Sequence, residues 1–212
     1  MSEQKQLDLL IERYPVLEAC RSQIDSAYRL IRRAYEQKGM LLVCGNGGSG
    51  ADSEHIVGEL MKEFSIRRPL PEEEKKRLHE GFSEDGRVLA DHLQGSLPAV
   101  TLTSNIALST AFANDAVPEL VFAQQVYGYG REGSALLGIS TSGNSRNVIY
   151  ALETARMKKM ATIGLTGEGG GRMRELCDVC ICVPATVTYQ VQELHLPVYH
   201  TLCLMLEEAF FG

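Results

Sequence analysis

A glycine-rich segment, Gly45–Gly50, could bind an anion. It reads GNGGSG and lies between an apolar run and a helical pattern. Glycines allow the backbone to approach a ligand closely, and the amides at a helix N-terminus favour negative charge. The segment therefore indicates an oxyanion or phosphate site. A plain tight turn and a dinucleotide site remain as alternatives, since GNGGSG also satisfies the GxGxxG pattern.

The dinucleotide alternative requires an acidic residue at the end of the next strand, where it would bind a ribose. The next strand-like run in this chain comes much later and ends with Leu102-Thr103-Ser104. The sequence therefore favours a phosphate group over a nicotinamide or flavin cofactor.

A second segment, Ser140–Ser145, reads STSGNS and carries four hydroxyl groups in six residues. Hydroxyls together with the free N–H groups of a helix N-terminus suit a phosphate monoester. Ordinary helix capping is the alternative, but it requires only one hydroxyl. The segment contains no P-loop lysine, which argues against a nucleoside triphosphatase. We therefore expect a phosphate-binding loop here.

Two pairs of polar residues share helix faces. His55 and Glu59 are four residues apart, so both side chains lie on one face, where they could bind one metal ion or act on one substrate. A surface ion pair is the alternative. Gln192 and His200 are eight residues apart, about two helical turns, in an otherwise apolar helix. For Gln192 and His200, helical spacing alone does not distinguish a functional role from a structural one.

The elements that must position these residues alternate between strand and helix. Short apolar runs predict strands at Met40–Cys44, Pro98–Thr103, Ala135–Ile139, Ala161–Leu165 and Asp178–Val183. Strands that alternate with helical patterns predict an α/β fold with a parallel sheet. Ligands bind beyond the carboxyl ends of such strands, so we expect the chemistry just after Cys44, Thr103 and Ile139.

The helical patterns divide the chain into an N-terminal helical segment, residues 1–38, and a larger domain, residues 39–212. Within the first, Pro15 separates a short helix from a longer one predicted at Val16–Gln37. Within the second, helices are predicted at Ala51–Phe64, from Ser104 as the cap to Phe112, from Pro118 to Tyr127, from Ser145 as the cap to Lys158, and at Val187–Phe210.

Residues 65–97 interrupt this rhythm and are predicted to form an insertion. The highly charged run Pro71–Glu80 predicts a surface helix, and apolar residues follow it at irregular spacing. A solvated surface helix is one interpretation. The other is a lid over the substrate or an arm that docks on a neighbouring subunit, since long insertions in compact domains are usually functional or disordered.

Composition excludes several classes of protein. The 212 residues are 44% hydrophobic with a formal net charge of −6, which argues against nucleic acid as the main partner. No apolar run approaches the roughly 18 residues of a membrane span. We expect the six cysteines to be reduced thiols of a cytoplasmic protein. The cluster at Cys177, Cys180 and Cys182 is interpreted as a strand with buried thiols rather than a metal site.

Taken together, the motifs resemble those of the phosphoheptose isomerases, the sedoheptulose-7-phosphate isomerases of the sugar isomerase (SIS) superfamily. The resemblance rests on five motifs in order, namely GNGGS, His55-x-x-x-Glu59, Asn114-Asp115, LLGISTSGNS, and Gln192-Glu193-x-His195 with His200. It implies a flavodoxin-like, doubly wound, five-stranded parallel sheet, the SIS domain, with N-terminal helices. It also implies a homotetramer with active sites at subunit contacts, and conversion of sedoheptulose 7-phosphate to a D-glycero-D-manno-heptose 7-phosphate through an enediol.

The resemblance also implies roles for particular residues. Glu59 and His200 are the expected acid–base pair. One zinc ion per subunit is expected on His55, Glu59, Gln192 and His200. The remaining expected substrate-binding residues, besides Glu59 and Gln192, are Asn46, Gly47, Gly48, Ser49, Asn114, Asp115, Ser140, Thr141, Ser142 and Ser145.

The chain also departs from the family pattern. Tyr189 and Gln190 stand where the family often has an acidic residue and an arginine, and Gly50-Ala51 replaces a stretch that often contains histidine. These differences bear on the substrate more than on the reaction class. The alternative function is a non-catalytic SIS module that binds a phosphosugar, or a protein, like the factor that associates with the bacterial replication initiator. Such a module would need the serine loop but no acid–base pair.

Overall fold

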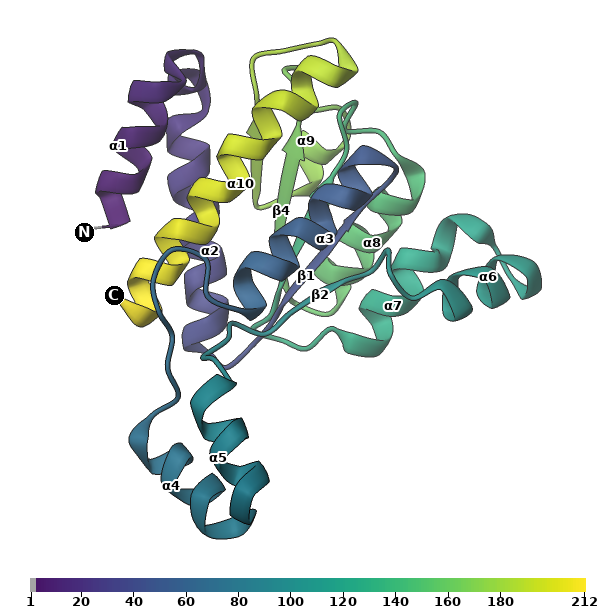
Figure 1. Cartoon of the computed structure of the whole chain (residues 1–212). Helices are drawn as coiled ribbons and strands as arrows, with labels where there is room; N and C mark the ends of the chain where they lie inside the picture. The colour runs from purple at the N-terminus through teal and green to yellow at the C-terminus, as the bar shows by residue number, and fades with distance from the viewer. Residues whose placement is uncertain (1–2) are drawn as a thin grey trace.

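Five parallel strands form the centre of the computed structural model, which describes residues 3–212. The spatial order of the strands is β2-β1-β3-β4-β5; Figure 1 labels β1, β2 and β4. This is the doubly wound, flavodoxin-like order, and it confirms the predicted fold class. The strands are β1 Leu41–Gly45, β2 Ala99–Thr101, β3 Ala135–Ile139, β4 Ala161–Thr166 and β5 Val179–Cys182.

Helices cover both faces of this sheet. One face carries α1 Glu3–Arg13, η1 Pro15–Cys20, α2 Arg21–Glu36, α3 Gly48–Met61 and the long C-terminal helix α10 Thr188–Phe211. The other carries α7 Val121–Tyr129, α8 Arg146–Met157 and α9 Met173–Leu176, while α6 Ile106–Asp115 and η2 Pro118–Leu120 lie beside α7. Within residues 3–212, no helix is both long and apolar enough to span a membrane.

Alternation along the strands creates two hydrophobic cores. In β1, Leu41 and Val43 face the core under α2 and α10, whereas Leu42 and Cys44 face the core under α7 and α8. All five residues of β1 are buried, as expected for a central strand covered on both sides. The sheet is therefore rigid where it delivers the loops that follow β1 and β3.

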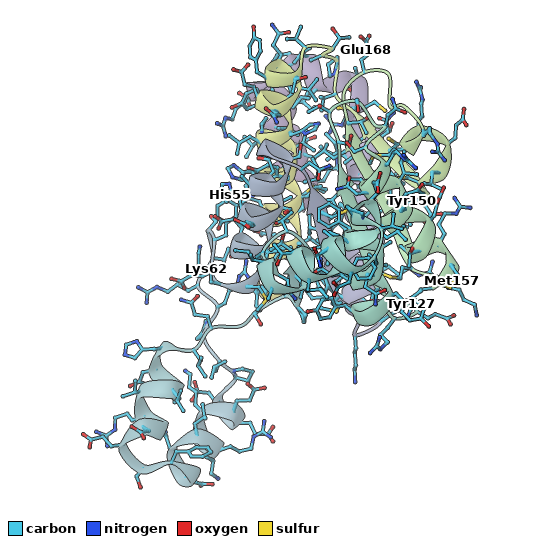
Figure 2. All side chains as sticks on the ribbon, turned by 90° about the vertical axis from the view of Figure 1, so that its right-hand side faces the viewer. His55, Lys62, Tyr127, Tyr150, Met157 and Glu168 are labelled. Atoms are coloured by element: carbon cyan, nitrogen blue, oxygen red, sulfur yellow. The ribbon has the colours of Figure 1, made fainter. Side chains whose placement is uncertain are left out.

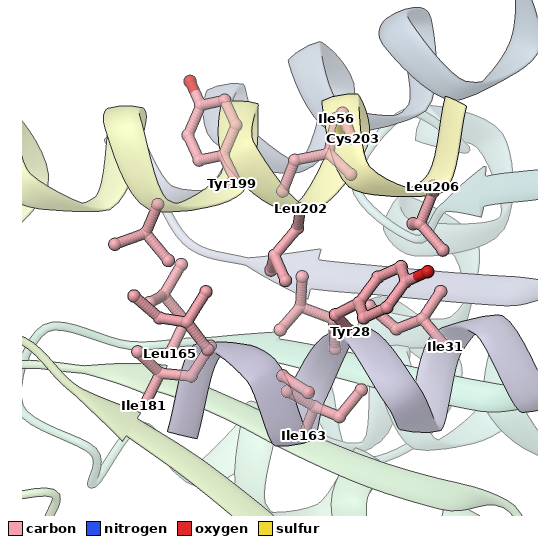
Figure 3. Close-up of a cluster of buried hydrophobic side chains, with 14 of the residues drawn as sticks. Tyr28, Ile31, Ile56, Ile163, Leu165, Ile181, Tyr199, Leu202, Cys203 and Leu206 are labelled. Atoms are coloured by element: carbon pink, nitrogen blue, oxygen red, sulfur yellow. The ribbon is translucent and has the colours of Figure 1, made fainter. Parts of the chain in front are cut away.

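The N-terminal helices contribute directly to the first core. Leu7, Leu17 and Ile24 are fully buried in the same cluster as Val43 and Ile163 of the sheet. Figure 3 shows α2 residues such as Tyr28 and Ile31 facing α10 residues such as Leu202 and Leu206 across this cluster. Residues 3–36 therefore belong to the same packed unit as the sheet.

Three local predictions were wrong. The expected continuous helix at Val16–Gln37 is a tight 3₁₀ segment, Pro15–Cys20, followed by α2. Proline fits the first position of such a turn, and Leu17 N–H closes it on the carbonyl of Tyr14. The cap of α6 is Asn105, whose side chain accepts from the N–H of Leu108, rather than Ser104. The helix after the glycine segment was predicted to begin at Ala51, but α3 begins at Gly48, within that segment.

The predicted insertion forms a helical hairpin that extends away from the sheet (Figures 1 and 2). Its helices, α4 Glu72–Gly81 and α5 Ser83–His92, pack on each other. We call residues 71–93 the arm. A bridge between Pro69 and Gln94 closes its base. The arm leaves the body beyond the C-terminal end of α3, so it does not cover the glycine or serine loops of its own chain, contrary to the lid interpretation.

Candidate active site

The serine loop begins directly at the end of β3. Ser140 N–H donates to Leu165 O at 3.1 Å, which continues the ladder between β3 and β4. Its hydroxyl lies 2.9 Å from that of Ser145 and 3.5 Å from that of Ser142. Ser145 is the N-cap residue of α8, as predicted, but its side chain makes no capping bond, and its hydroxyl contacts that of Ser140 instead. Three hydroxyls thus gather at one point.

Neighbouring loops hold the serine loop in place. Gly143 has a φ of 65°, and a Cβ added there would lie 2.0 Å from the carbonyl oxygen of Gly170, so only glycine fits. Asn144 donates to Ser142 O and accepts from Arg172 N–H. Thr141 O accepts from Gly167 N–H. The loop is therefore preorganised before any ligand binds.

The glycine loop joins the neighbouring strand β1 to α3. Gly47 has a φ of 55°, and α3 starts at the next residue, Gly48. Gln192 of α10 lies against this start, since a Cβ on Gly48 would lie 2.5 Å from its amide nitrogen. Because β1 pairs with β3, the N-termini of α3 and α8 open on the same edge of the sheet. Both helix dipoles favour an anion there.

An amide pair that the sequence reasoning missed connects the two loops. Asn46 donates to Asn147 Oδ1 at 2.9 Å, and Asn147 donates back to Asn46 Oδ1 at 2.8 Å. Asn147 lies in the first turn of α8, two residues after Ser145. Its position beside the predicted phosphate loop was the only signal in the sequence that could have suggested it.

Three polar side chains meet farther along α3. His55 Nε2 lies 3.2 Å from Glu59 Oε1 and 3.5 Å from Nε2 of His200, which comes from α10. Lys62 Nζ donates to the other oxygen of Glu59 at 3.2 Å. Burial, and then the charge of His55, lower the pKa of His200. The predicted acid–base pair, Glu59 and His200, is brought together through His55.

The Nδ1 side of His55 leads to two residues that sequence reasoning did not identify, Tyr199 and, through it, Asp52. His55 Nδ1 lies 3.0 Å from the hydroxyl of Tyr199, and that hydroxyl donates to Asp52 Oδ1 at 3.2 Å. Burial raises the pKa of Tyr199, as does the neighbouring carboxylate of Asp52. Asp52 is on the same helix as His55, and Tyr199 is adjacent to His200, so only the packing of α3 on α10 shows that they belong together.

The structure does not bring Gln192 to the other three predicted metal ligands. Helices α3 and α10 run parallel, because Gly48 meets Gln192 and, farther along, His55 meets Tyr199. The eight residues from Gln192 to His200 correspond to about 12 Å of helix. Gln192 therefore belongs with the glycine loop in this structure.

Asn114 and Asp115 lie apart from both groups. They are exposed at the end of α6, where Asn114 donates to the carboxylate of Asp115 at 2.9 Å. Helix α6 packs on η2 and α7 rather than on α3 or α10. Within one chain, these two predicted sugar contacts do not join the site.

The donor types of the histidine cluster suit zinc. Among residues 3–212, no group of three or more His, Cys, Asp or Glu side chains is already arranged to hold a metal ion. His55 nevertheless contacts Glu59 and His200 at distances close to the roughly 3.3 Å that separates two ligands of a tetrahedral zinc. The nitrogen and oxygen donors of His55, Glu59 and His200 are of the types that zinc binds.

The cysteines of the C-terminal half remain thiols. All six cysteines of the chain are free. Burial, and then the neighbouring Cys182, raise the pKa of Cys180 to about 12, and burial also raises the pKa of Cys177. Burial thus favours the protonated form of these thiols. The cluster lies at β5 and the turn before it, in agreement with the strand interpretation.

Comparison with known proteins identifies the class and then the family. The model of the SIS domain family matches residues 10–82 and 89–167. Phosphoheptose isomerases from Rhodospirillum rubrum and Akkermansia muciniphila are 39% and 34% identical to this chain. These matches cover 90% and 96% of this chain, and 87% and 94% of the relatives. The structure of phosphoheptose isomerase GmhA from Neisseria gonorrhoeae matches with a TM-score of 0.74 at 31% identity, over 95% of this chain and 94% of that one.

The doubly wound sheet with a serine loop after β3 is thus an SIS domain. The chain belongs to the phosphoheptose isomerase family and is an isomerase. The non-catalytic alternative is not supported. Within the predicted insertion, residues 65–97, the family match leaves out residues 83–88.

Proposed function

We propose that this isomerase converts sedoheptulose 7-phosphate to a D-glycero-D-manno-heptose 7-phosphate through an enediol. The observation that carries the proposal is the meeting of Glu59 and His200 with His55 between α3 and α10, on a domain that also carries a preorganised serine loop. The names of the relatives support a seven-carbon sugar phosphate as the substrate.

The serine loop binds the phosphate in this proposal. The hydroxyls of Ser140, Ser142 and Ser145 point to one place, and the N-termini of α3 and α8 add N–H groups and dipoles of the matching sign. Asn46, Gly47 and Gly48 line the approach from β1. Hydrogen bonds to a charged oxygen contribute about 1.5–3 kcal/mol each, so the loop provides the affinity for the substrate.

Glu59 and His200 move the protons. In the forward direction Glu59 removes a proton from C1 of the ketose, and His200 donates one to the carbonyl oxygen at C2, which gives the enediol. Removal of the proton from the C1 hydroxyl and delivery of one to C2 then give the aldose. Each well-placed acid or base contributes roughly 10²–10⁴-fold to the rate.

We further propose that one zinc ion per subunit binds at His55, Glu59 and His200. Gln192, the fourth ligand that the resemblance implies, lies beside Gly48 in this structure and is not included in this ligand set. When bound, such a metal would polarise the carbonyl and stabilise the developing oxyanion. Glu59 cannot bind zinc tightly and act as a free base at the same moment, so one of these two roles must yield during the reaction. Elemental analysis of protein purified without chelator tests this proposal, with His79→Gln on the arm as a control for surface histidines.

The proposed active enzyme is a cytoplasmic homotetramer with sites at subunit contacts. The eleven residues from Gly48 to Glu59 correspond to about 16 Å of helix. Six C–C bonds of about 1.5 Å each span at most about 9 Å, so one heptose extends over only part of that distance. The remoteness of Asn114 and Asp115 in one chain also supports completion of the site by a neighbour.

Incubation with sedoheptulose 7-phosphate tests the function directly. Formation of the aldose, followed by NMR or a coupled assay, supports the proposal. Fructose 6-phosphate and sedoheptulose without phosphate serve as comparison substrates for chain length and for the phosphate group. Failure to convert sedoheptulose 7-phosphate, with or without added Zn²⁺, would contradict it.

A further inference from the structure

The chain from His55 to Tyr199 to Asp52 determines which nitrogen of His55 carries the proton. Tyr199 has a single hydroxyl proton, which it donates to Asp52 Oδ1 at 3.2 Å. A carboxylate is only an acceptor. The hydroxyl oxygen, 3.0 Å from His55 Nδ1, can then only accept. A neutral His55 therefore carries its proton on Nδ1.

The opposite nitrogen of His55 is thereby left without a proton. Its lone pair at Nε2 faces Glu59 Oε1 at 3.2 Å and His200 Nε2 at 3.5 Å. A carboxylate and an unprotonated imidazole nitrogen at this distance repel each other unless a proton or a metal cation lies between them. The arrangement prepares His55 to share a cation with Glu59 and His200.

We propose that Tyr199 and Asp52 are positioning residues that hold His55 in the Nδ1–H tautomer, with Nε2 directed into the active site. The Tyr199 residue is buried, and its ring contacts those of His55 and His200 edge-on. Figure 3 shows its hydroxyl directed away from the core cluster beneath α10. The ring is therefore held by packing while its hydroxyl remains available to His55.

Fixing a tautomer through a second residue has a known effect on imidazole chemistry. A hydrogen bond to one ring nitrogen orients the ring and raises the basicity of the other, and removal of such a partner costs about 10–100-fold in metal affinity or activity. The role in turnover rests on the proposed isomerase function. The role in tautomer selection does not.

The test is long-range ¹H–¹⁵N NMR of protein with ¹⁵N-labelled histidine rings at pH 8, where His55→Gln assigns the signals of His55. The parent protein should show His55 as the Nδ1–H tautomer. Tyr199→Phe should abolish this preference. Asp52→Ala should move the proton to Nε2, because the freed Tyr199 hydroxyl can then donate to Nδ1.

Tyr35→Phe is the matched control. The Tyr35 hydroxyl is buried and has no hydrogen-bond partner among residues 3–212, so the same chemical change removes no bond there. It should leave the signals of His55 in place. The kinetic counterpart is a 10–100-fold lower kcat for Tyr199→Phe with little change in KM, because the serine loop is untouched.

Two results would overturn the proposal. One is an Nε2–H tautomer of His55 in the parent protein. The other is a His55 spectrum that Tyr199→Phe leaves unchanged. A third result separates the two proposals. If Tyr199→Phe shifts the tautomer of His55 as expected but neither the parent nor this variant isomerises sedoheptulose 7-phosphate, the positioning role stands and the proposed substrate is wrong.

Discussion

Arg68 and Glu207 form an ion pair in which neither side chain is exposed to solvent. Arg68 Nε donates to Glu207 Oε1 at 2.8 Å, and its other nitrogens donate to the carbonyls of Glu59 and Leu60 at the end of α3. Glu207 also accepts from the backbone N–H groups of residues 64–66. The pair satisfies the free carbonyls of a helix C-terminus and fixes the end of α3 that carries Glu59 against α10.

Replacing Glu59 by glutamine should lower turnover by about 10²-fold or more while the protein stays folded. The substitution keeps the shape of the side chain and removes its ability to take a proton. Steady-state kinetics and circular dichroism measure the two effects. Glu54→Gln, an exposed change on the same helix, is the control and should leave both turnover and the circular dichroism spectrum unchanged. A rate for Glu59→Gln close to that of the parent would exclude Glu59 as the base.

Replacing Ser142 by alanine should weaken substrate binding by about 10–100-fold, since a hydrogen bond to a charged oxygen contributes about 1.5–3 kcal/mol. The effect should appear mainly in KM. Inorganic phosphate as a competitive inhibitor should lose affinity in parallel. Ser22→Ala on α2 is a suitable control, because Ser22 is exposed and, among residues 3–212, its hydroxyl bonds only to its sequence neighbour Gln23. Unchanged inhibition by phosphate would show that the phosphate binds elsewhere.

Mixing two impaired variants, assayed at a substrate concentration well below the KM of Ser142→Ala, tests whether sites are shared between subunits. Glu59→Gln removes the base, and Ser142→Ala weakens the phosphate loop. If the loop of one chain works with Glu59 of another, hybrids formed by unfolding and refolding the mixture contain some intact sites. Activity should then recover to a measurable fraction of that of the parent. Activity that remains at the level of the separate variants would place both groups of a site in one chain.

Acidification should destabilise the fold through His195. This residue is fully buried in α10, and burial lowers its pKa to about 4, against the opposing effect of the Thr166 backbone. In the unfolded chain the ring has its ordinary pKa of about 6.5. Because the unfolded state then binds the proton more tightly, the stability present above pH 6.5 decreases as the pH falls toward 4.

Between pH 6.5 and pH 4, His195 should lower the free energy of unfolding by an amount on the order of 3 kcal/mol. Urea unfolding of the parent and of His195→Gln at pH 7.5 and pH 4.5 measures it. The variant should show a smaller difference between the two pH values. Equal differences would assign the acid sensitivity to other groups.

Deleting residues 71–93 and joining the ends with a short glycine linker should leave the body folded. The arm contributes no residue to either of the two hydrophobic core clusters. The unfolding temperature should change by less than about 4 °C, which corresponds to about 1 kcal/mol or less for a domain of this size. Turnover and molecular mass measured on the same sample test whether the arm docks on a neighbouring subunit. Loss of the cooperative unfolding transition in the deletion variant would show that the arm is part of the core.

Much of this architecture could be predicted because its signals are local. The apolar runs that end at Cys44 and Ile139 marked strands, and the glycine and hydroxyl residues that follow them marked the binding edge. Asp52 and Tyr199 carried no such signal, since 147 residues separate them and only helix packing brings them together. The same packing placed Gln192 beside Gly48, which its spacing to His200 could not indicate.

The reciprocal amide pair of Asn46 and Asn147 makes ligand entry an exchange rather than an addition. Each amide already satisfies the other, so a sugar that uses Asn46 displaces both bonds. The pair is exposed, so water can take up a bond that the ligand leaves unmade, and each bond contributes only about 0.5–1.5 kcal/mol net. Because the two amides come from different loops, a ligand that engages Asn46 also releases Asn147, and the glycine loop and the start of α8 respond to it together.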